Sequence, residues 1–334
     1  MKVLFVPVTY NSYDALESYI ASVGKALEAA ADPTIEVKIH VADNSTFSRN
    51  EECGMWNENS QSADSSAAHS GDETNLIPHS TFLIPQETTH YPNPGYLPAA
   101  LKTVYSEDYA SYDYIIISNV DVTLDETFFT ALRDLKADTD TVWIAPFIWS
   151  PSEQRDVNPK IQERYTKKRL LLLRLLFACP PLYYLYTRTV YRIKYSRKEE
   201  RGARPKDACY QRDARMRNEN SQSTDYSGND TNLIPHSTFH IPPKAIYAGH
   251  GSFMIFRPEI FQQEPSLDYP VFLFCEEIYM AEMAQHIGKK VTHCPSVKVW
   301  DCEHASTGLM GLWRYCKYNH DALSYIIRTF YEQD

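Results

Sequence analysis

The sequence predicts an α/β fold: a doubly wound, mainly parallel sheet with helices on both faces. Continuous apolar runs, typical of strands covered on both faces, alternate along the chain with patterns of helical period. Such alternation indicates a parallel sheet. Several of the runs end in short polar tips. Because ligands of these sheets bind beyond the carboxyl ends of the strands, the tips mark the expected binding edge.

The first half of the chain supplies four predicted strands. An amphipathic helix follows the first strand, and a second helix is expected over residues 124–135. The strands are predicted at 3–8, 35–41, 114–118 and 142–147, and the face of the first helix consists of Leu16, Tyr19, Ile20, Val23 and Leu27. The polar tips are Thr9–Asn11, Asp43–Ser45 and Asn119–Asp121.

The second half continues the pattern. A turn and strand are expected over 245–256, where the small residues of Gly249-His250-Gly251-Ser252 allow close backbone approach. A helix at 276–287 and a strand at 291–299 follow. A last amphipathic helix covers about 309–330, and its buried face is expected to contain Leu312, Trp313, Cys316, Leu323, Ile326, Ile327 and Phe330.

Charge is distributed unevenly. The net charge of −10 argues against general nucleic-acid binding. Residues 155–217, however, contain 18 of the 33 Lys and Arg and only 6 Asp and Glu, so this segment is near +12 and the remainder near −22. Such asymmetry indicates a surface that meets anions.

Residues 160–200 combine basic, aromatic and apolar side chains. Their apolar run is too short for a bilayer-spanning helix and is interrupted by Arg174 and by Pro180-Pro181. The composition suits the membrane interface, and a surface helix pair packed on the core is the alternative. The chain begins without a signal-peptide pattern, and its seven cysteines include no CxxC, so we expect a reduced, cytoplasmic protein.

Two segments are nearly duplicated. Residues 57–64 read NENSQSAD and 218–225 read NENSQSTD, while 74–82 and 231–239 are both TNLIPHSTF. Two distant copies are not a solenoid repeat, and their polar composition is typical of loops. We interpret them as related insertions peripheral to the chemistry, with a paired binding element as the alternative.

The residues that can carry chemistry follow the strands. Asp121, directly after a strand, is placed to hold a divalent cation bound to a diphosphate, although capping of the next helix would also explain it. Glu276 and Glu277 start a predicted helix, whose dipole keeps a carboxylate ionised as a base or is simply compensated by it. Asp43 and Asn44 offer partners to a nucleobase edge, or form a turn.

Histidine and cysteine residues near the last strand offer further ligands. His304 comes just after this strand and is either structural or a metal ligand. The group His293, Cys294, Cys302 and His304 matches no common zinc module in its spacing.

These segments together resemble glycosyltransferase family 2, which has the GT-A fold, and especially its bacterial surface-polysaccharide enzymes of rhamnosyltransferase type. The resemblance covers most of the chain outside 47–85 and 155–243, and the matching pieces occur in the order typical of the family. They are VPVTYNSYDALESYIASV at 6–23, VADNS at 41–45, NPGY at 93–96, IIISNVDVTLDETFF at 115–129, GHGSFMIFRPEIF at 249–261, FLFCEEIYMAEMAQHIGKKV at 272–291 and VWDCEHAST at 299–307.

The resemblance implies a role for each matching residue. Asn119 and Asp121 stand where the family carries its DxD-type motif, and Asn119 replaces the first acid. His304 resembles the further metal ligand, for Mg²⁺ or Mn²⁺, and Glu277 or Glu276 the base. The nucleotide-sugar site would contain Thr9, Tyr10, Asn11, Asp43, Asn44, Asn93, Gly95, Tyr96, Asn119 and Asp121, and the acceptor side would contain Gly251 and Ser252.

The resemblance also implies an organisation and an activity. Residues 1–150, with a loop insert at about 47–85, would bind the nucleotide sugar; 151–243 would be a basic segment with the second insert; 244–334 would be the acceptor and catalytic half. The expected reaction is inverting transfer of a sugar to a polysaccharide or lipid-linked glycan at the inner face of the plasma membrane. A sugar nucleotidyltransferase is the nearest rival, but Thr9-Tyr10-Asn11-Ser12 lacks the Gly, Lys and Arg of its phosphate loop. A catalytically inactive nucleotide- or glycan-binding scaffold is the other alternative.

Overall fold

The computed structural model describes residues 1–45, 84–135, 138–199, 242–302 and 310–332. The chain divides into two compact units, Met1–Ala178 with Ile241–Asp334, and Cys179–His240. The first unit contains the sheet and the candidate site. Strands from 1–150 and from 244–334 lie in one sheet there, and the domain boundaries expected at 150 and 243 remain a prediction.

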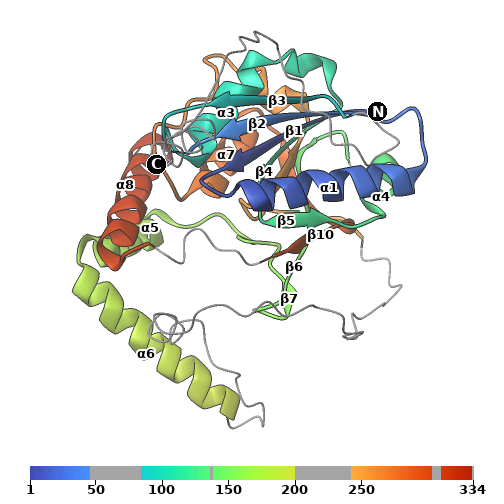
Figure 1. Ribbon diagram of the computed structural model, residues 1–334. Coiled ribbons are helices and arrows are strands. Elements are labelled where there is room, and N and C mark those ends of the chain that lie inside the picture. The colour runs from blue at the N-terminus through green and yellow to red at the C-terminus, as the bar shows by residue number, and fades with distance from the viewer. Residues whose placement is uncertain (46–83, 136–137, 200–241, 303–309, 333–334) are drawn as a thin grey trace, which may run out of the picture. The chain divides into compact units, whose positions relative to one another are not determined.

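The first unit is a mixed α/β layer structure, which confirms the predicted fold class (Figure 1). Its strands are β1 Lys2–Thr9, β2 Glu36–Asp43, β3 Gln86–His90, β4 Tyr114–Asn119, β5 Val122–Leu124, β6 Thr141–Ser150, β7 Arg155–Asp156, β8 Lys244–Ile246, β9 Phe253–Phe256 and β10 Lys290–Asp301. Its helices are α1 Tyr13–Ala30, α3 Tyr96–Ser106, α4 Phe128–Arg133, α5 Lys167–Ala178, α7 Glu276–His286 and α8 Leu312–Phe330.

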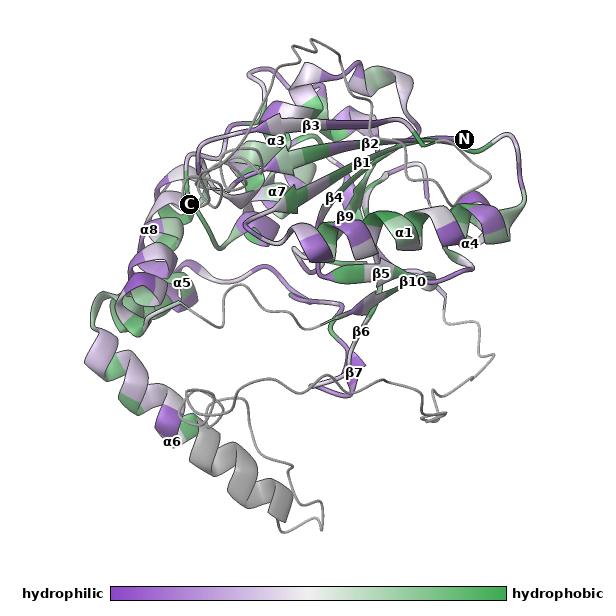
Figure 2. Ribbon diagram, in the orientation of Figure 1, coloured by the Kyte–Doolittle hydropathy of each residue, from purple (hydrophilic) through white to green (hydrophobic). Residues whose placement is uncertain are grey.

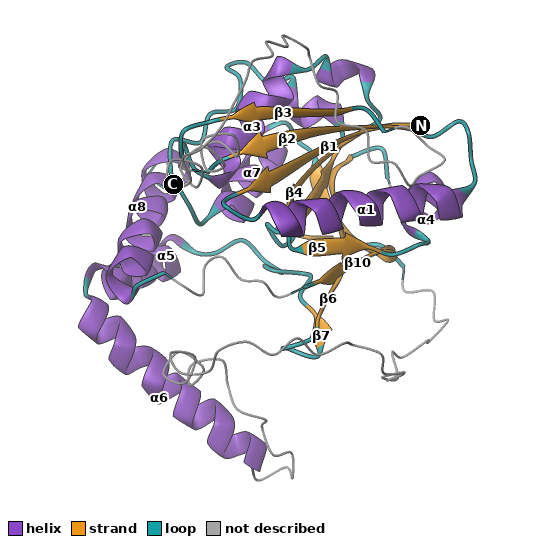
Figure 3. Cartoon of the chain, in the orientation of Figure 1, coloured by secondary structure: helices purple, strands orange, loops and turns teal. Residues whose placement is uncertain are grey.

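The sheet order is β3-β2-β1-β4-β9-β6-β10-β5, with β7 beside β6 and β8 beside β10. The strands β3, β2, β1 and β4 are mutually parallel, and Figure 3 shows β1, β2 and β3 pointing the same way. Strand β9 runs antiparallel to both β4 and β6. Its first residue therefore lies at the same edge as the last residues of β1, β2 and β4.

Hydrophobic side chains fill both faces of the sheet. Helices α1 and α4 cover one face, and α3, α7 and α8 cover the other. Figure 2 shows hydrophobic residues along β1 and β2, as expected of strands that are buried on both sides. All five predicted face residues of α1 are buried.

Several elements differ from the sequence prediction. The strand β3 and the helix α3 were not predicted, since β3 is half-exposed and lacks an apolar run. The helix expected over 124–135 is shortened to α4 by the short strand β5, which pairs with β10. Trp313 is 71 % exposed, so its predicted place on the buried face of α8 is wrong.

The second unit is described here only by α6, Pro180–Glu199. Among the described residues, no single helix has the length and apolar composition needed to cross a membrane. The consecutive helices Lys167–Ala178 and Pro180–Val190 meet that condition only when taken together. The duplicated segments at 57–82 and 218–239 lie outside the described residues.

Candidate functional site

The polar tips of three strands meet at one edge of the sheet. Thr9 is in register with Asp43, and Val8 with Asn119. Ser118, one residue before Asn119, is in register with Phe253, the first residue of β9. The structure therefore brings together the strand-end residues that the sequence predicts for the site.

Polar groups surround the Asp43 carboxylate. Asp43 is buried, and its carboxylate accepts hydrogen bonds from the Tyr13 hydroxyl at 3.0 Å and from the Ser45 amide at 3.1 Å. The Nδ1 atom of His90 lies 3.4 Å from the same carboxylate. Ser45 belongs to the polar tip that the sequence predicts after β2, but sequence reasoning gave it no role and missed Tyr13 and His90. The positions of Tyr13 in the first turn of α1 and of His90 at the end of β3 become informative only when the strand order is known.

The loop that precedes α3 contacts the residues next to Asp43. The Gly95 amide donates a hydrogen bond of 3.1 Å to the Asn44 side chain. Gly95 has φ +112°, and a Cβ atom there would lie 2.3 Å from the carbonyl oxygen of Phe272, so no other residue fits. Asn11 and Asn93 also have positive φ, which asparagine tolerates better than most residues. Tyr10, the residue before Asn11, is 42 % exposed, so its side chain is accessible.

The loop Gly249–Ser252 connects the two halves of the site. Its Ser252 carbonyl accepts a hydrogen bond of 2.8 Å from the Asn119 amide. Its Gly251 carbonyl accepts one of 2.8 Å from the Tyr96 hydroxyl, and a Cβ atom on Gly251 would lie 3.3 Å from Oε1 of Glu277. The loop thus contacts the Asn119–Asp121 turn, α3 and the start of α7.

His250 fixes this loop internally. Its Nδ1 atom is 2.8 Å from the Ser252 hydroxyl and accepts a hydrogen bond of 3.2 Å from the Ser252 amide. Burial, followed by the nearby Lys160 ammonium, lowers the pKa of His250 to about 4, and Glu277 partly opposes this shift. The ring is therefore neutral near pH 7. Because an amide can only donate, the proton of the neutral ring must be on Nε2.

The two glutamates at the start of α7 differ in environment. Glu276 is buried, and its Oε1 accepts a hydrogen bond of 2.7 Å from the Phe274 amide. Burial, followed by the charge of Glu277, raises the pKa of Glu276 to about 8, so Glu276 holds a proton at neutral pH. Glu277 faces Gly251 instead. The preceding Phe274 and Cys275 have φ +74° and +61°, a left-handed conformation that is rare outside glycine and concentrated at functional sites.

Three carboxyl groups gather around Tyr96. Burial first, then the charges of Glu276, Glu277 and Asp121, raise the pKa of the Tyr96 hydroxyl well above its usual value. The Asp121 carbonyl accepts a hydrogen bond of 2.8 Å from the Cys302 amide, which places the end of β10 beside this residue. His304 lies two residues further, outside the described part of the chain.

The Asp121 carboxylate is of the ligand type that hard divalent cations prefer. Two residues before it, Asn119 offers an amide where a second carboxylate would be needed for an acidic pair. A cation held there needs phosphate oxygens and water to complete its oxygen ligands, as is usual for Mg²⁺ bound with a nucleotide diphosphate.

A separate group of His40, Glu87 and Glu107 has ligand atoms close enough to one another to hold a metal ion. The Lys38 ammonium lies 2.8 Å from Glu107 and 3.0 Å from Glu87, however. Since Lys38 already supplies a positive charge between the two carboxylates, an ion-pair network on β2, β3 and the end of α3 accounts for the cluster. Of the four residues whose spacing matches no common zinc module, Cys294 is buried and Cys302 is exposed. His293, the third described member, has its Nε2 atom 3.1 Å from the Asp156 carboxylate.

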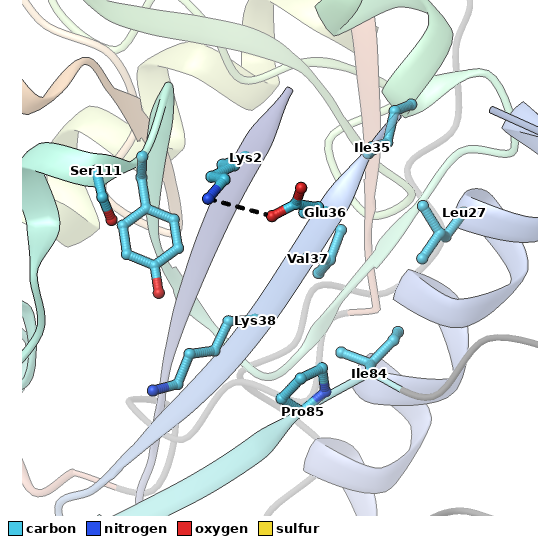
Figure 4. Close-up of a pocket in the computed structure, with 10 residues that line it drawn as sticks. Lys2, Leu27, Ile35, Glu36, Val37, Lys38, Ile84, Pro85 and Ser111 are labelled. Carbon is cyan, nitrogen blue, oxygen red and sulfur yellow. Dashed lines mark ion pairs between the residues drawn. The ribbon is translucent and has the colours of Figure 1, made fainter. Parts of the chain in front are cut away.

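The cavity drawn in Figure 4 lies away from this site. It has a volume of about 380 Å³ and is lined by residues that include Lys2 and Glu36, at the beginnings of β1 and β2. Lys2 and Glu36 form an ion pair of 3.3 Å across its wall. The cavity is therefore at the opposite end of these strands from Thr9 and Asp43.

No family model and no curated protein matches the chain. Similar solved structures include Staphylococcus aureus TarS residues 1–349 with UDP-GlcNAc, 9 % identical over 44 % of this chain and 34 % of that one, with a TM-score of 0.29. The mannosyltransferase PcManGT from Pyrobaculum calidifontis with GDP-Man and Mn²⁺ is 12 % identical over 98 % and 64 %, with a TM-score of 0.46. GalNAc-T7 with UDP, GalNAc and Mn²⁺ is 11 % identical over 100 % and 49 %, with a TM-score of 0.45. The chain thus spans less than two thirds of the length of each of these three structures.

Proposed function

We propose that the chain is an inverting glycosyltransferase that moves a sugar from a nucleotide-diphosphate sugar to a hydroxyl group of a glycan. The proposal assigns it to glycosyltransferase family 2, with a GT-A fold and similarity to rhamnosyltransferases. The observation that carries it is the loop Gly249–Ser252. One end of this loop bonds the turn that leads to Asp121, and the middle of the loop packs against the Glu277 carboxylate. A diphosphate site and a base are thereby held on either side of one short segment.

The donor half of the site consists of Asp43, the groups that bond to it and the strand ends. The Asp43 carboxylate, fixed by Tyr13 and Ser45, is proposed to accept a hydrogen bond from the N–H of a pyrimidine base. Thr9, Tyr10, Asn11, Asn44, Asn93, Gly95 and Tyr96 line the nucleoside and sugar. Asp121 is proposed to share Mg²⁺ or Mn²⁺ with His304 and the donor diphosphate, and the ion supplies positive charge that stabilises the leaving diphosphate.

The base is proposed to be Glu277. Glu276 holds a proton near neutral pH and is bonded to the Phe274 amide, so it is poorly placed to accept another proton. Glu277 takes the proton of the acceptor hydroxyl, whose oxygen forms a bond to the anomeric carbon while the bond from that carbon to the diphosphate breaks. Attack from the face opposite the leaving group inverts the centre. Gly251 has no side chain to crowd the Glu277 carboxylate, and the Ser252 carbonyl accepts a hydrogen bond from the Asn119 amide. Both residues are proposed to lie on the acceptor side.

The acceptor is proposed to be a cell-surface polysaccharide or a lipid-linked glycan. The enzyme would then work in the cytoplasm at the inner face of the plasma membrane, in peripheral contact through residues 160–200. The excess of positive charge over 155–217 supports an anionic surface as the partner of this region.

A screen of nucleotide sugars tests the proposal. UDP-, GDP- and dTDP-sugars are added with and without Mn²⁺, and a ligand of the native state raises the thermal midpoint with its occupancy. Release of the nucleoside diphosphate is then compared between wild type and Glu277→Gln. We expect the variant to bind the donor and to lose about 10²- to 10⁴-fold in turnover, the usual contribution of a general base. Normal turnover by Glu277→Gln refutes the base. Donor binding without turnover in the wild type, with added glycan acceptors, favours the inactive scaffold.

A further inference from the structure

The helix α5 presents leucine on the side that faces away from the core. On the core side, Leu170 is fully buried, and Leu173 and Phe177 pack against the same cluster. Residues three and four apart share a face of a helix, so 170, 173 and 177 form one stripe. A second set of leucines lies on the outer side of α5: Leu171, Leu172 and Leu175, whose side chains are 36 %, 66 % and 64 % exposed. We call this exposed set the α5 stripe. Packing against the core, where α8 contacts α5, therefore explains Leu170, Leu173 and Phe177. It does not explain the exposed leucines of the α5 stripe.

The charges on α5 have one sign. Its twelve residues include four cations and no acid. These α5 cations are Lys167, Lys168, Arg169 and Arg174. Long basic side chains can keep their charge at the lipid headgroups while their stems cover apolar surface. A helix with exposed leucine and only positive charge suits a surface of anionic phosphates above hydrocarbon better than an uncharged protein face.

The neighbouring helix adds an aromatic residue. Helix α8 lies along α5 (Figure 1), and the rings of Phe177 and Tyr315 are 6.0 Å apart. Trp313, two residues before Tyr315, is 71 % exposed in the first turn of α8. Tryptophan is enriched at the boundary between hydrocarbon and headgroups. The one residue of α8 that contradicts the predicted buried face is therefore of the kind that membrane interfaces select.

We propose that the α5 stripe and Trp313 enter the interface of an anionic lipid bilayer, where the α5 cations contact lipid phosphates. The helix then lies in the interface and does not span the bilayer. This binding does not depend on the proposed glycosyl transfer, and its test needs no donor or acceptor.

Co-sedimentation of the full chain with vesicles tests the proposal. One set of vesicles is phosphatidylcholine alone, and the other contains about 30 % phosphatidylglycerol, an anionic lipid. We expect binding to the anionic vesicles that weakens as salt is raised, because salt screens the contacts of the α5 cations. The double variant Leu172→Ser/Leu175→Ser should bind at least about tenfold more weakly, since it removes apolar surface from the interface. Its nucleotide binding and thermal midpoint should be unchanged, since both side chains are exposed.

Matched variants separate the two contributions. Lys167→Ser/Lys168→Ser should lose the preference for anionic vesicles, while Lys25→Ser/Lys102→Ser, with the same charge change on the exposed side chains of α1 and α3, should keep it. Trp313 fluorescence gives a second measurement, with Trp313→Phe to assign the signal, and should shift to the blue on anionic vesicles.

Three outcomes overturn the proposal. One is the absence of vesicle binding by the wild type, and another is equal binding by wild type and Leu172→Ser/Leu175→Ser. The third is a wild-type dimer in vesicle-free sedimentation that the double variant converts to a monomer, because the stripe would then bind a second copy. Equal binding to both vesicle types overturns the role of the α5 cations.

Discussion

The Cα atom of Gly251 faces the carboxyl group of Glu277 so closely that a Cβ atom on residue 251 would lie 3.3 Å from both Cδ and Oε1 of Glu277. This contact predicts that Gly251→Ala lowers turnover by about tenfold or more. The carboxylate must move by a few tenths of an ångström, and small displacements of reacting groups are costly in rate. Nucleoside diphosphate release measures the effect, and the thermal midpoint should stay near that of the wild type.

Gly311→Ala is the matched control for this variant. A Cβ atom on Gly311 has nothing within 4 Å, so its activity should equal that of the wild type. Equal activity of Gly251→Ala and Gly311→Ala would contradict the assignment of Glu277 as the base next to the loop.

The raised pKa of Glu276 predicts that the stability of the protein falls as the pH rises. Its pKa in the folded protein is raised to about 8 from an ordinary value of 4.5 by burial and by Glu277. Between these two values the folded protein binds more protons than the unfolded chain. The free energy of unfolding therefore falls as the pH rises through this window, and levels off above it. Glu276→Gln removes this dependence while keeping an oxygen for the Phe274 amide.

Urea unfolding at about pH 5, 7 and 9 measures the difference, and the wild type should lose stability relative to Glu276→Gln as the pH rises. The same variant should retain most of the turnover that Glu277→Gln loses. Parallel stability curves for wild type and variant would show that Glu276 is ionised in the fold at neutral pH.

His250 is predicted to act by position, through an Nδ1 atom that only accepts hydrogen bonds. Asparagine at this position can accept the Ser252 amide as in an Asx turn, whereas glutamine and alanine cannot do so in the same geometry. We expect His250→Asn to retain turnover within about threefold and His250→Gln to lose about tenfold or more. Loss of turnover in both variants by the same factor would instead indicate that the Nε2–H group takes part.

Nitrogen NMR of histidine gives an independent measurement. The His250 signal, assigned by its absence in His250→Asn, should belong to a neutral ring with its proton on Nε2 down to about pH 5, because its pKa is lowered to about 4. An ordinary titration near neutrality would refute the assignment.

The local sequence pattern was enough to predict the buried strands and the polar residues at their carboxyl ends. The runs at Val3–Val8 and Tyr114–Ser118 mark buried strands by composition alone, and both are strands in the structure. Asp43, Asn119 and Asp121 follow from the rule that ligands bind at the carboxyl ends of strands. Ser45 lies in the same predicted tip as Asp43. Tyr13 and His90 do not follow from that rule, because Tyr13 comes near Asp43 only when β1 is placed beside β2, and His90 only when β3 is placed beside β2.

Tertiary packing decides the points that pattern left open. Nothing in the order Glu276-Glu277 distinguishes the two side chains. Their difference arises because the left-handed turn at Phe274 and Cys275 directs Glu276 to a backbone amide, while Glu277 faces the loop at Gly251. Likewise the helical period places Trp313 on the apolar face of α8, but the structure leaves it exposed.

We expect the Asp43 carboxylate to contribute to the affinity for the nucleoside. Asp43→Asn should weaken UDP binding by about tenfold or more, since a hydrogen bond to a charged group contributes roughly 1.5–3 kcal/mol. Calorimetric titration with UDP in Mn²⁺ measures it. Tyr13→Phe removes one of the groups that orient the carboxylate and should have a smaller effect in the same direction. Unchanged UDP affinity in Asp43→Asn would show that the nucleobase does not bind at Asp43.

Because Asn119 takes the place of a second acid, we expect substitutions at 119 and 121 to change the requirement for a metal ion. With Asp121 as the one carboxylate of the motif, the ion should be held weakly without the donor, and turnover should be abolished by EDTA and restored by Mn²⁺. Asn119→Asp supplies the second acid, so the Mn²⁺ concentration for half-maximal turnover should fall by about threefold or more, whereas Asp121→Asn should raise it or abolish turnover. Asp138→Asn, an exposed acid paired with Lys290, is the matched control and should leave the requirement unchanged. If Asn119→Asp and Asp121→Asn both leave the Mn²⁺ dependence as in the wild type, the ion is not held by this turn, and its ligands must come from residues other than Asp121.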